Sequence, residues 1–325
     1  MHIFLVILFF EFMILSHEMG HFLVGKFFKV AVKEFSIGFG PTVLKKEKNK
    51  TNYCLRLFPL GGFVCFDDEE FVKKPIFKRM IIFLAGPFSN FIFAIFSISC
   101  LLFIQGSFNS TEVGFVDEFC TQFKVGDEIK KVNGHKVFSA DDFIYNIKKA
   151  PLNEPINVVV KRNGKKIELL DVAKKSKNFE KDKGKIGITL KVKSLNFFNF
   201  FEQIFNTFIF IIKLILTSFA RCVMSFSFKE VSGPIGVINA FKETAKVGVK
   251  SMLSFFAFLS INLGIFNLFP IPALDGGQIL FLIIEYILKR PIKKEVSVFL
   301  TRFGLMFIFF VSFVVCLKDI FVNFF

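Results

Sequence analysis

Long apolar runs alternate with shorter polar, lysine-rich stretches along this chain of 325 residues. A helix needs roughly 20 apolar residues to cross a bilayer core of about 30 Å. Runs of that length lie at residues 2–28, 79–104, 251–269 and 301–325. The pattern predicts an α-helical multispanning membrane protein with about four transmembrane helices.

Residues 197–219 form a further apolar run, but this run carries Glu202, Asn206 and Lys213. Polar residues within an apolar helix favour a position in the membrane interface. We therefore expect residues 194–250 to be an amphipathic linker of interfacial helices, although the length of the run also allows a crossing.

Residues 30–66 change to a period of two, with glycines and prolines at 38–41 and 59–62. Alternating apolar and polar positions are typical of half-buried strands, and Gly and Pro supply the turns. An isolated hairpin is only marginally stable in water. We expect a small membrane-associated β-hairpin region that packs against the spanning helices.

The apolar runs stop at residues 105–193, where strand patterns such as 156–161 are separated by turn dipeptides such as Asn133-Gly134. Fewer than 90 residues make one small α/β domain. We expect this domain to be inserted between the two halves of a membrane core, residues 1–104 and 251–325.

Composition supports a membrane protein, because 53% of the residues are hydrophobic and the mean hydropathy is +0.57. The net charge of +15 could indicate nucleic-acid binding, but the lysines cluster between the apolar runs. This distribution is typical of cytoplasmic loops, so we expect no nucleic-acid partner. A long domain is translocated despite its own charge, which predicts that residues 105–193 lie on the other side. The six cysteines form no CxxC pair, and we expect no disulfide.

The first apolar run contains an HExxH pattern formed by His17, Glu18 and His21. Residues four apart share one face of a helix, so both imidazoles can bind one metal ion with the carboxylate beside it. A catalytic zinc ion needs such a set, a further ligand and an open position for water. Ionisable groups are costly in a membrane helix, which argues against a chance match.

A third ligand is expected just after the run at 251–269, where Asn267, Pro270, Pro272 and Asp275 follow one another. The prolines end the helix, and irregular backbone at membrane depth is tolerated only where protein or water covers it. Asp275 could complete a His2Asp site for Zn²⁺ or could cap a helix. Asn267 could donate its amide to a developing oxyanion or to substrate backbone, or it could only pack.

These motifs resemble the site-2 protease family of intramembrane zinc metalloproteases. The similarity is to bacterial members of the regulator of sigma-E protease type, which have a single PDZ domain and cut anti-sigma factors and signal peptides. It extends over nearly the whole chain. The segments that carry it are His17-Glu-Met-Gly-His21, Phe35-Ser-Ile-Gly-Phe-Gly-Pro41, Ala85-Gly-Pro-Phe-Ser-Asn90, residues 267–276, and the PDZ-like Val125-Gly-Asp-Glu-Ile129 and Val132-Asn-Gly134.

The resemblance implies a zinc-dependent endopeptidase that cleaves transmembrane segments of single-span membrane proteins within the lipid bilayer. It makes His17, His21 and Asp275 the Zn²⁺ ligands and Glu18 the catalytic carboxylate. Asn90 would only support the site. The sheet at residues 30–66 would be the membrane-embedded loop that presents the substrate.

The resemblance also implies a place in the cell and a partner. The protein would be a multi-pass protein of the bacterial inner membrane, with the metal site toward the cytoplasmic side and the PDZ-like domain on the extracytoplasmic side. That domain would act as a size filter behind an upstream site-1-type protease. The residues alone leave open a non-catalytic membrane zinc-binding or PDZ scaffold protein, whose structural zinc would need a fourth protein ligand.

Overall fold

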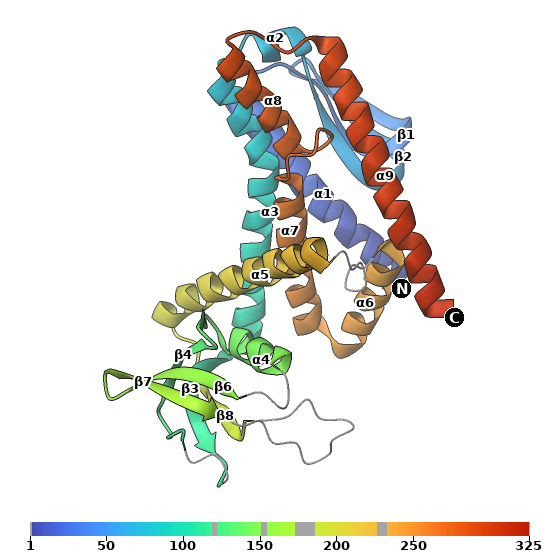
Figure 1. Cartoon of the computed structure of the whole chain (residues 1–325). Helices are drawn as coiled ribbons and strands as arrows, with labels where there is room; N and C mark the ends of the chain where they lie inside the picture. Colours follow the sequence, from blue (N-terminus) through green and yellow to red (C-terminus); the bar gives the residue numbers. More distant parts are fainter. Residues whose placement is uncertain (1, 119–121, 151–154, 173–185, 226–232, 325) are drawn as a thin grey trace. The chain divides into compact units, whose positions relative to one another are not determined.

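The structure is a computed structural model that describes the chain except for residues 1, 119–121, 151–154, 173–185, 226–232 and 325 (Figure 1). The chain divides into two compact units, residues 1–97 together with 217–325, and residues 98–216. The second unit extends beyond the expected inserted domain at both of its ends.

The first unit consists mainly of helices, with one small sheet. Its elements in chain order are α1 (His2–Phe27), β1 (Val32–Lys48), β2 (Thr51–Phe66), α2 (Asp68–Val72), most of α3 (Ile76–Gln105), the end of α5 (Phe197–Ser225), α6 (Pro234–Val247), α7 (Val249–Asn267), α8 (Asp275–Leu288) and α9 (Lys294–Phe324).

Four of the described helices, α3, α5, α7 and α9, are long and apolar enough to cross a membrane. Together with the sheet regions, they fit the predicted multispanning membrane protein. α3, α7 and α9 coincide with expected crossings. The first expected crossing, residues 2–28, forms the helix α1, which is not among these four. The helix α5 has 29 residues, so its length and composition allow a crossing where we expected an interfacial helix.

The helices of the first unit approach each other at glycines. A Cβ atom at Gly20 of α1 would overlap the carbonyl group of Ala85 in α3, and a Cβ atom at Gly264 of α7 would overlap the ring of Phe91 in α3. Small residues at a crossing let two helix backbones come close, which is the main way that helices pack in a membrane. As a result α3 is in contact with both α1 and α7.

The sheet of the first unit has two strands that each bend back on themselves. Residues 34–37 of β1 pair with both 52–55 and 62–65 of β2, while 42–48 pair with 51–56. Four segments therefore lie in the order 42–48, 51–56, 34–37 and 62–66.

The bends confirm the turns expected at 38–41 and 59–62, because Gly38, Gly40 and Gly61 all have positive φ. The turn between the two strands was not predicted. It is formed by Asn49 and Lys50, both in the left-handed region. Such a pair closes a two-residue hairpin without any glycine.

The second unit is a curved sheet with one helix against it. Its elements are β3 (Ser107–Val116), β4 (Glu128–Val132), β5 (His135–Lys136), α4 (Ala140–Lys149), β6 (Ile156–Arg162), β7 (Lys165–Val172), β8 (Ile188–Ser194) and the beginning of α5. The strand order is β7-β6-β4-β3-β8, with β5 paired to β4. Its core is apolar and contains Val113, Ile129, Val158 and Phe143.

A buried ion pair joins the turn before β4 to the end of β6 in this unit. Asp127 is fully buried and accepts two hydrogen bonds of 2.6 Å from Arg162 and one of 2.9 Å from the backbone N–H of Lys124. Burial opposes the ionisation of Asp127, but these hydrogen bonds outweigh it and hold the pKa of its carboxyl group below the usual range. The turn before β4 is therefore fixed by a charged group rather than by packing alone.

Candidate metal centre

Two imidazoles converge on one side of α1. His17 and His21 are one helical turn apart and buried, each about 8% exposed, and their Nε2 atoms lie 3.2 Å apart. The spacing of four residues predicted this shared face, and the structure has it.

Asp275 reaches the same point from the first turn of α8. Its Oδ2 lies 3.1 Å from Nε2 of His17, and its Oδ1 lies 3.4 Å from Nε2 of His21. One ligand atom from each of the three residues can be chosen so that all lie within 4.8 Å of one another. Residues 258 positions apart along the chain are thus brought together as expected.

The polar atoms of these three side chains fit a bound cation better than they fit hydrogen bonds to one another. Nδ1 of His21 lies 2.8 Å from the carbonyl oxygen of Ile82, which can only accept, so Nδ1 carries the proton and Nε2 has a lone pair. That lone pair meets the carboxylate of Asp275, whose buried Oδ2 has no hydrogen-bond partner among the described residues. A lone pair and a carboxylate that face each other without a donor fit a metal ion, and a His2Asp set fits Zn²⁺.

The helix α3 supports both imidazoles from behind. Ile82 accepts from His21, and a Cβ atom at Gly86 would overlap the rings of His21 and His17. Only glycine allows α3 to pass this close, so the Ala85-Gly86-Pro87 motif has a steric reason beyond helix packing.

Asn90 contacts His17 from the next turn of α3. It is fully buried, and its Nδ2 lies 3.1 Å from Nδ1 of His17, while its Oδ1 has no partner within the described residues. The hydroxyl of Ser260 in α7 donates to the backbone oxygen of Asn90 at 2.8 Å, which fixes this turn of α3. The sequence suggested only a supporting role for Asn90, and the structure supplies the contact.

The segment before Asp275 is irregular but well hydrogen-bonded. The carbonyl of Pro272 accepts from Nε2 of Gln278 at 2.9 Å and lies 3.3 Å from the hydroxyl of Thr301. Cβ atoms at Gly276 and Gly277 would overlap backbone atoms of residues 268–269 and 271–272. The Leu-Asp-Gly-Gly sequence therefore lets α8 begin directly against the preceding turn, which places Asp275.

Glu18 lies on α1 next to this centre and faces the sheet. Its Oε2 accepts from the backbone N–H of Val64 at 3.0 Å. Val64 belongs to the outer segment 62–66 of the sheet, so the carboxylate connects the metal centre to a strand edge.

Glu11 makes a parallel contact that the sequence reasoning missed. It lies seven residues, about two turns, before Glu18 on α1, and its Oε2 accepts from the backbone N–H of Gly61 at 2.6 Å. Its Oε1 is buried without a hydrogen-bond partner in the described part of the chain. The signal that could have found it is a carboxylate within an apolar run.

Asn267 is not brought into the centre by any contact of the described residues. It is the last residue of α7 and is half-buried. Its suggested part in binding an oxyanion or a substrate remains a prediction.

A buried ion pair joins α3 and α8 on the side of the centre away from Asn90. Arg79 donates to both carboxylate oxygens of Glu285, at 2.5 and 3.2 Å. A bidentate pair of this kind fixes orientation as well as distance. It helps to set α8, and with it Asp275, against the helix that supports the imidazoles.

Comparison with known proteins indicates a zinc metalloprotease. Residues 4–311 match the profile of peptidase family M50. A Fusobacterium nucleatum protein that bears the provisional name of a zinc metalloprotease is 34% identical over 94% of this chain and 95% of its own length. The regulator of sigma-W protease RasP of Bacillus subtilis is 29% identical over 97% of both chains. The chloroplastic membrane metalloprotease ARASP of Arabidopsis thaliana is 31% identical over 94% of this chain and 76% of its own.

Proposed function

This chain belongs to peptidase family M50, the site-2 protease family, and is therefore a zinc-dependent intramembrane protease of regulated proteolysis; from that premise we propose which of its residues carry the reaction. His17, His21 and Asp275 hold the Zn²⁺, and Glu18 is the catalytic carboxylate. The observation that carries this proposal is the convergence of two Nε2 atoms and a carboxylate whose buried Oδ2 has no hydrogen-bond partner among the described residues.

The chemistry is divided between the metal and one carboxylate. When bound, Zn²⁺ supplies a Lewis acid that activates water and polarises a peptide carbonyl. Glu18 takes up the proton of the attacking water and passes it to the leaving amine. Its Oε2 already accepts from Val64, so Oε1 is the oxygen that moves the proton.

Asn90 sets the proton position on His17. In the orientation with Nδ2 toward His17, the amide oxygen stays unpaired in a fully buried place. Rotation of the amide by half a turn lets Oδ1 accept from Nδ1–H of His17 and leaves Nε2 free for the metal. Ile82 does the same for His21.

The substrate is a membrane-bound protein that must be extended where it is cut. A helix hides its carbonyl groups in i to i−4 hydrogen bonds, so the scissile stretch has to unwind first. Residues 62–66 form an outer segment of the sheet, and Val64 of that segment contacts Glu18. We propose that substrate adds to this edge as a strand, which replaces the lost main-chain hydrogen bonds. Asn267 remains a candidate for holding that strand.

The remaining parts of the proposal rest on sequence. Residues 1–104 and 251–325 form the protease core, 105–193 form a PDZ-like domain, and 194–250 link the two. The lysine-rich loops put the metal site toward the cytoplasm of a bacterial inner membrane and the PDZ-like domain on the extracytoplasmic side. The strand order and α4 of the second unit support a PDZ-like domain that filters substrates already trimmed by a site-1-type protease.

The test replaces the carboxylate and leaves the ligands in place. Glu18→Gln should bind zinc as the native chain does but lose cleavage of a single-span reporter by at least roughly 10²-fold. Asp275→Asn should lose both zinc and cleavage. Ser89→Ala removes the hydrogen bond from the Ser89 hydroxyl in α3 to the backbone oxygen of Ser16 in α1 without removing a ligand, and should retain both. Cleavage by Glu18→Gln at a native rate would remove Glu18 from the mechanism.

A further inference from the structure

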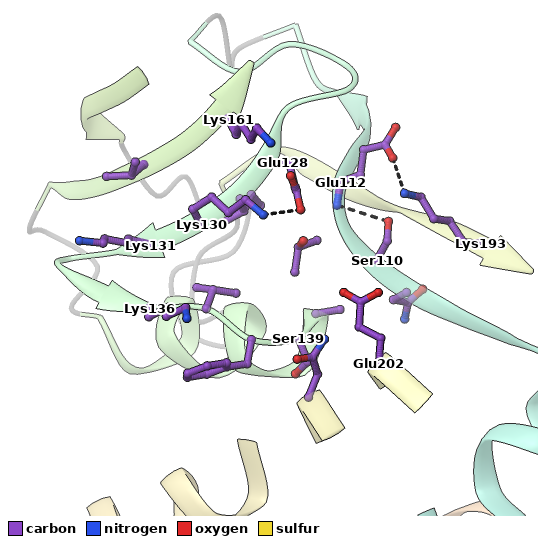
Figure 2. A pocket seen from close by; sticks show the side chains of 18 of the residues that line it. Ser110, Glu112, Glu128, Lys130, Lys131, Lys136, Ser139, Lys161, Lys193 and Glu202 are labelled. Atoms are coloured by element: carbon purple, nitrogen blue, oxygen red, sulfur yellow. Dashed lines mark hydrogen bonds and ion pairs between the residues drawn. The ribbon is translucent and has the colours of Figure 1, made fainter. Parts of the chain in front are cut away.

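A cavity of about 940 Å³ opens on the second unit, far in sequence from the metal ligands. Figure 2 shows charged side chains around it, from β3, β4 and the start of α5. Six lysines and three glutamates line it. They are Lys130, Lys131, Lys136, Lys161, Lys166 and Lys193, with Glu112, Glu128 and Glu202.

Lysines face lysines across the strands of this cavity. Lys161 of β6 is the direct partner of Lys166 of β7, and Lys131 of β4 is the direct partner of Lys136 of β5. Like charges directly opposite each other destabilise a sheet. Two such pairs on the wall of one cavity leave a local positive charge that a bound anion would compensate.

Two of the three glutamates of the cavity are held in ion pairs by other lysines, although Glu128 also lies opposite Lys161. Glu128 is paired with Lys130 at 2.5 Å, and Glu112 with Lys193 at 2.7 Å (Figure 2). The ion pairs of Glu112 with Lys193 and Lys191 hold the pKa of its carboxyl group below the usual range. This carboxylate therefore stays ionised and paired with those two lysines. Within the described residues, the lysines of the two facing pairs form no ion pair.

The cavity also contains an incomplete strand edge. β3 pairs with β4 at one position only, Glu112 with Glu128, and diverges from it before that point. Residues 108–111 of β3 line the cavity, while the pairing of 107–109 with β8 occupies the opposite edge. An extended peptide can add to such an edge with main-chain hydrogen bonds.

We propose that this cavity binds an extended acidic peptide segment. Its main chain pairs with residues 108–111, and its carboxylates face the pairs Lys161–Lys166 and Lys131–Lys136. A flat anionic lipid surface fits less well, because a lipid headgroup makes no use of a strand edge. An acidic flank of a membrane-bound substrate is the natural source, a point that rests on the proposed function.

Fluorescence anisotropy on the full chain in detergent tests the proposal. The probe is a short fluorescein-labelled peptide in which Glu alternates with Thr, and its matched control has Gln in place of Glu. Lys131→Glu/Lys166→Glu should weaken binding of the Glu peptide about tenfold. Lys148→Glu/Lys149→Glu makes the same change in net charge on exposed positions of α4 outside the cavity, and should leave binding within about twofold.

The test separates this site from the protease. Lys166→Glu turns a like-charge pair into an opposite-charge pair with Lys161, so the cavity variant should unfold no more easily than the native chain. The Glu18→Gln variant should bind the peptide as the native chain does, whatever its effect on cleavage. Equal loss in both double variants, equal binding of the Gln peptide, or binding of anionic lipid vesicles without binding of the peptide would each overturn the proposal.

Discussion

The contact between Asn90 and His17 gives a prediction about zinc affinity. Asn90→Leu keeps the size of the side chain but removes the acceptor of Nδ1–H, and that donor lies where no water reaches it. A buried unsatisfied donor costs about 1–3 kcal/mol. Since about 1.4 kcal/mol is tenfold in affinity, zinc binding should weaken roughly 5- to 150-fold. Loss of a contact that orients a metal ligand typically costs about 10- to 100-fold, which agrees.

The assay is competition for zinc with a chromophoric chelator, followed by cleavage of a single-span reporter. Asn90→Leu should lose cleavage at low free zinc and regain it when zinc is raised. The backbone oxygen that accepts from Ser260 is unchanged, so the packing of α3 against α7 should survive. Asn90→Asp supplies an acceptor in the same place and should bind zinc nearly as the native chain does.

Two results would refute this reasoning. Asn90→Leu could bind zinc within about twofold of the native chain, which would mean that His17 needs no partner. Alternatively, Asn90→Asp could lose as much affinity as Asn90→Leu, which would make the effect one of packing alone.

Two further predictions concern other carboxylates. Glu11→Leu removes the acceptor of the Gly61 N–H and should lower kcat/KM about tenfold without changing zinc affinity. Glu11→Gln keeps an acceptor and should retain most activity. A loss of zinc affinity in Glu11→Leu as large as its loss of activity would contradict a role confined to the sheet. Asp127 has a lowered pKa in the folded chain, so its contribution is present above the pKa of the unfolded chain and is lost as pH falls through the folded value. The protection factors of the β4 and β6 amides against hydrogen exchange should therefore fall below about pH 4 in the native chain, and Arg162→Gln should remove most of that dependence.

The metal centre could be predicted largely from the sequence because the types of its side chains indicate the chemistry directly. The spacing of His17 and His21 places them on one helix face. An aspartate that follows two prolines in an apolar segment is costly to bury, which favours a functional role such as metal binding. The structure places all three together. Family membership, zinc and intramembrane proteolysis agree with that interpretation.

The features that could not be predicted depend on how segments distant in sequence pair in the folded chain. The glycines predicted turns, but the order of the four sheet segments requires residues 34–37 of β1 to lie between the two halves of β2. The contact of Glu11 with Gly61 follows from that order and has no spacing signature. The facing lysines of the second unit are likewise invisible until the strand registers are known, because register depends on long-range pairing.

The glycine of α3 behind the imidazoles limits how an inhibitor can be built. Gly86 has no side chain, and its main chain lies directly against the rings of His17 and His21. That flank of the site is therefore closed by backbone and has no room for a bulky group. We expect a zinc-binding group to enter from the side of Val64 and Glu18, where the strand edge lies. Compounds that extend as a short peptide mimic from the zinc-binding group should therefore gain affinity, whereas branching on the Gly86 flank should abolish it.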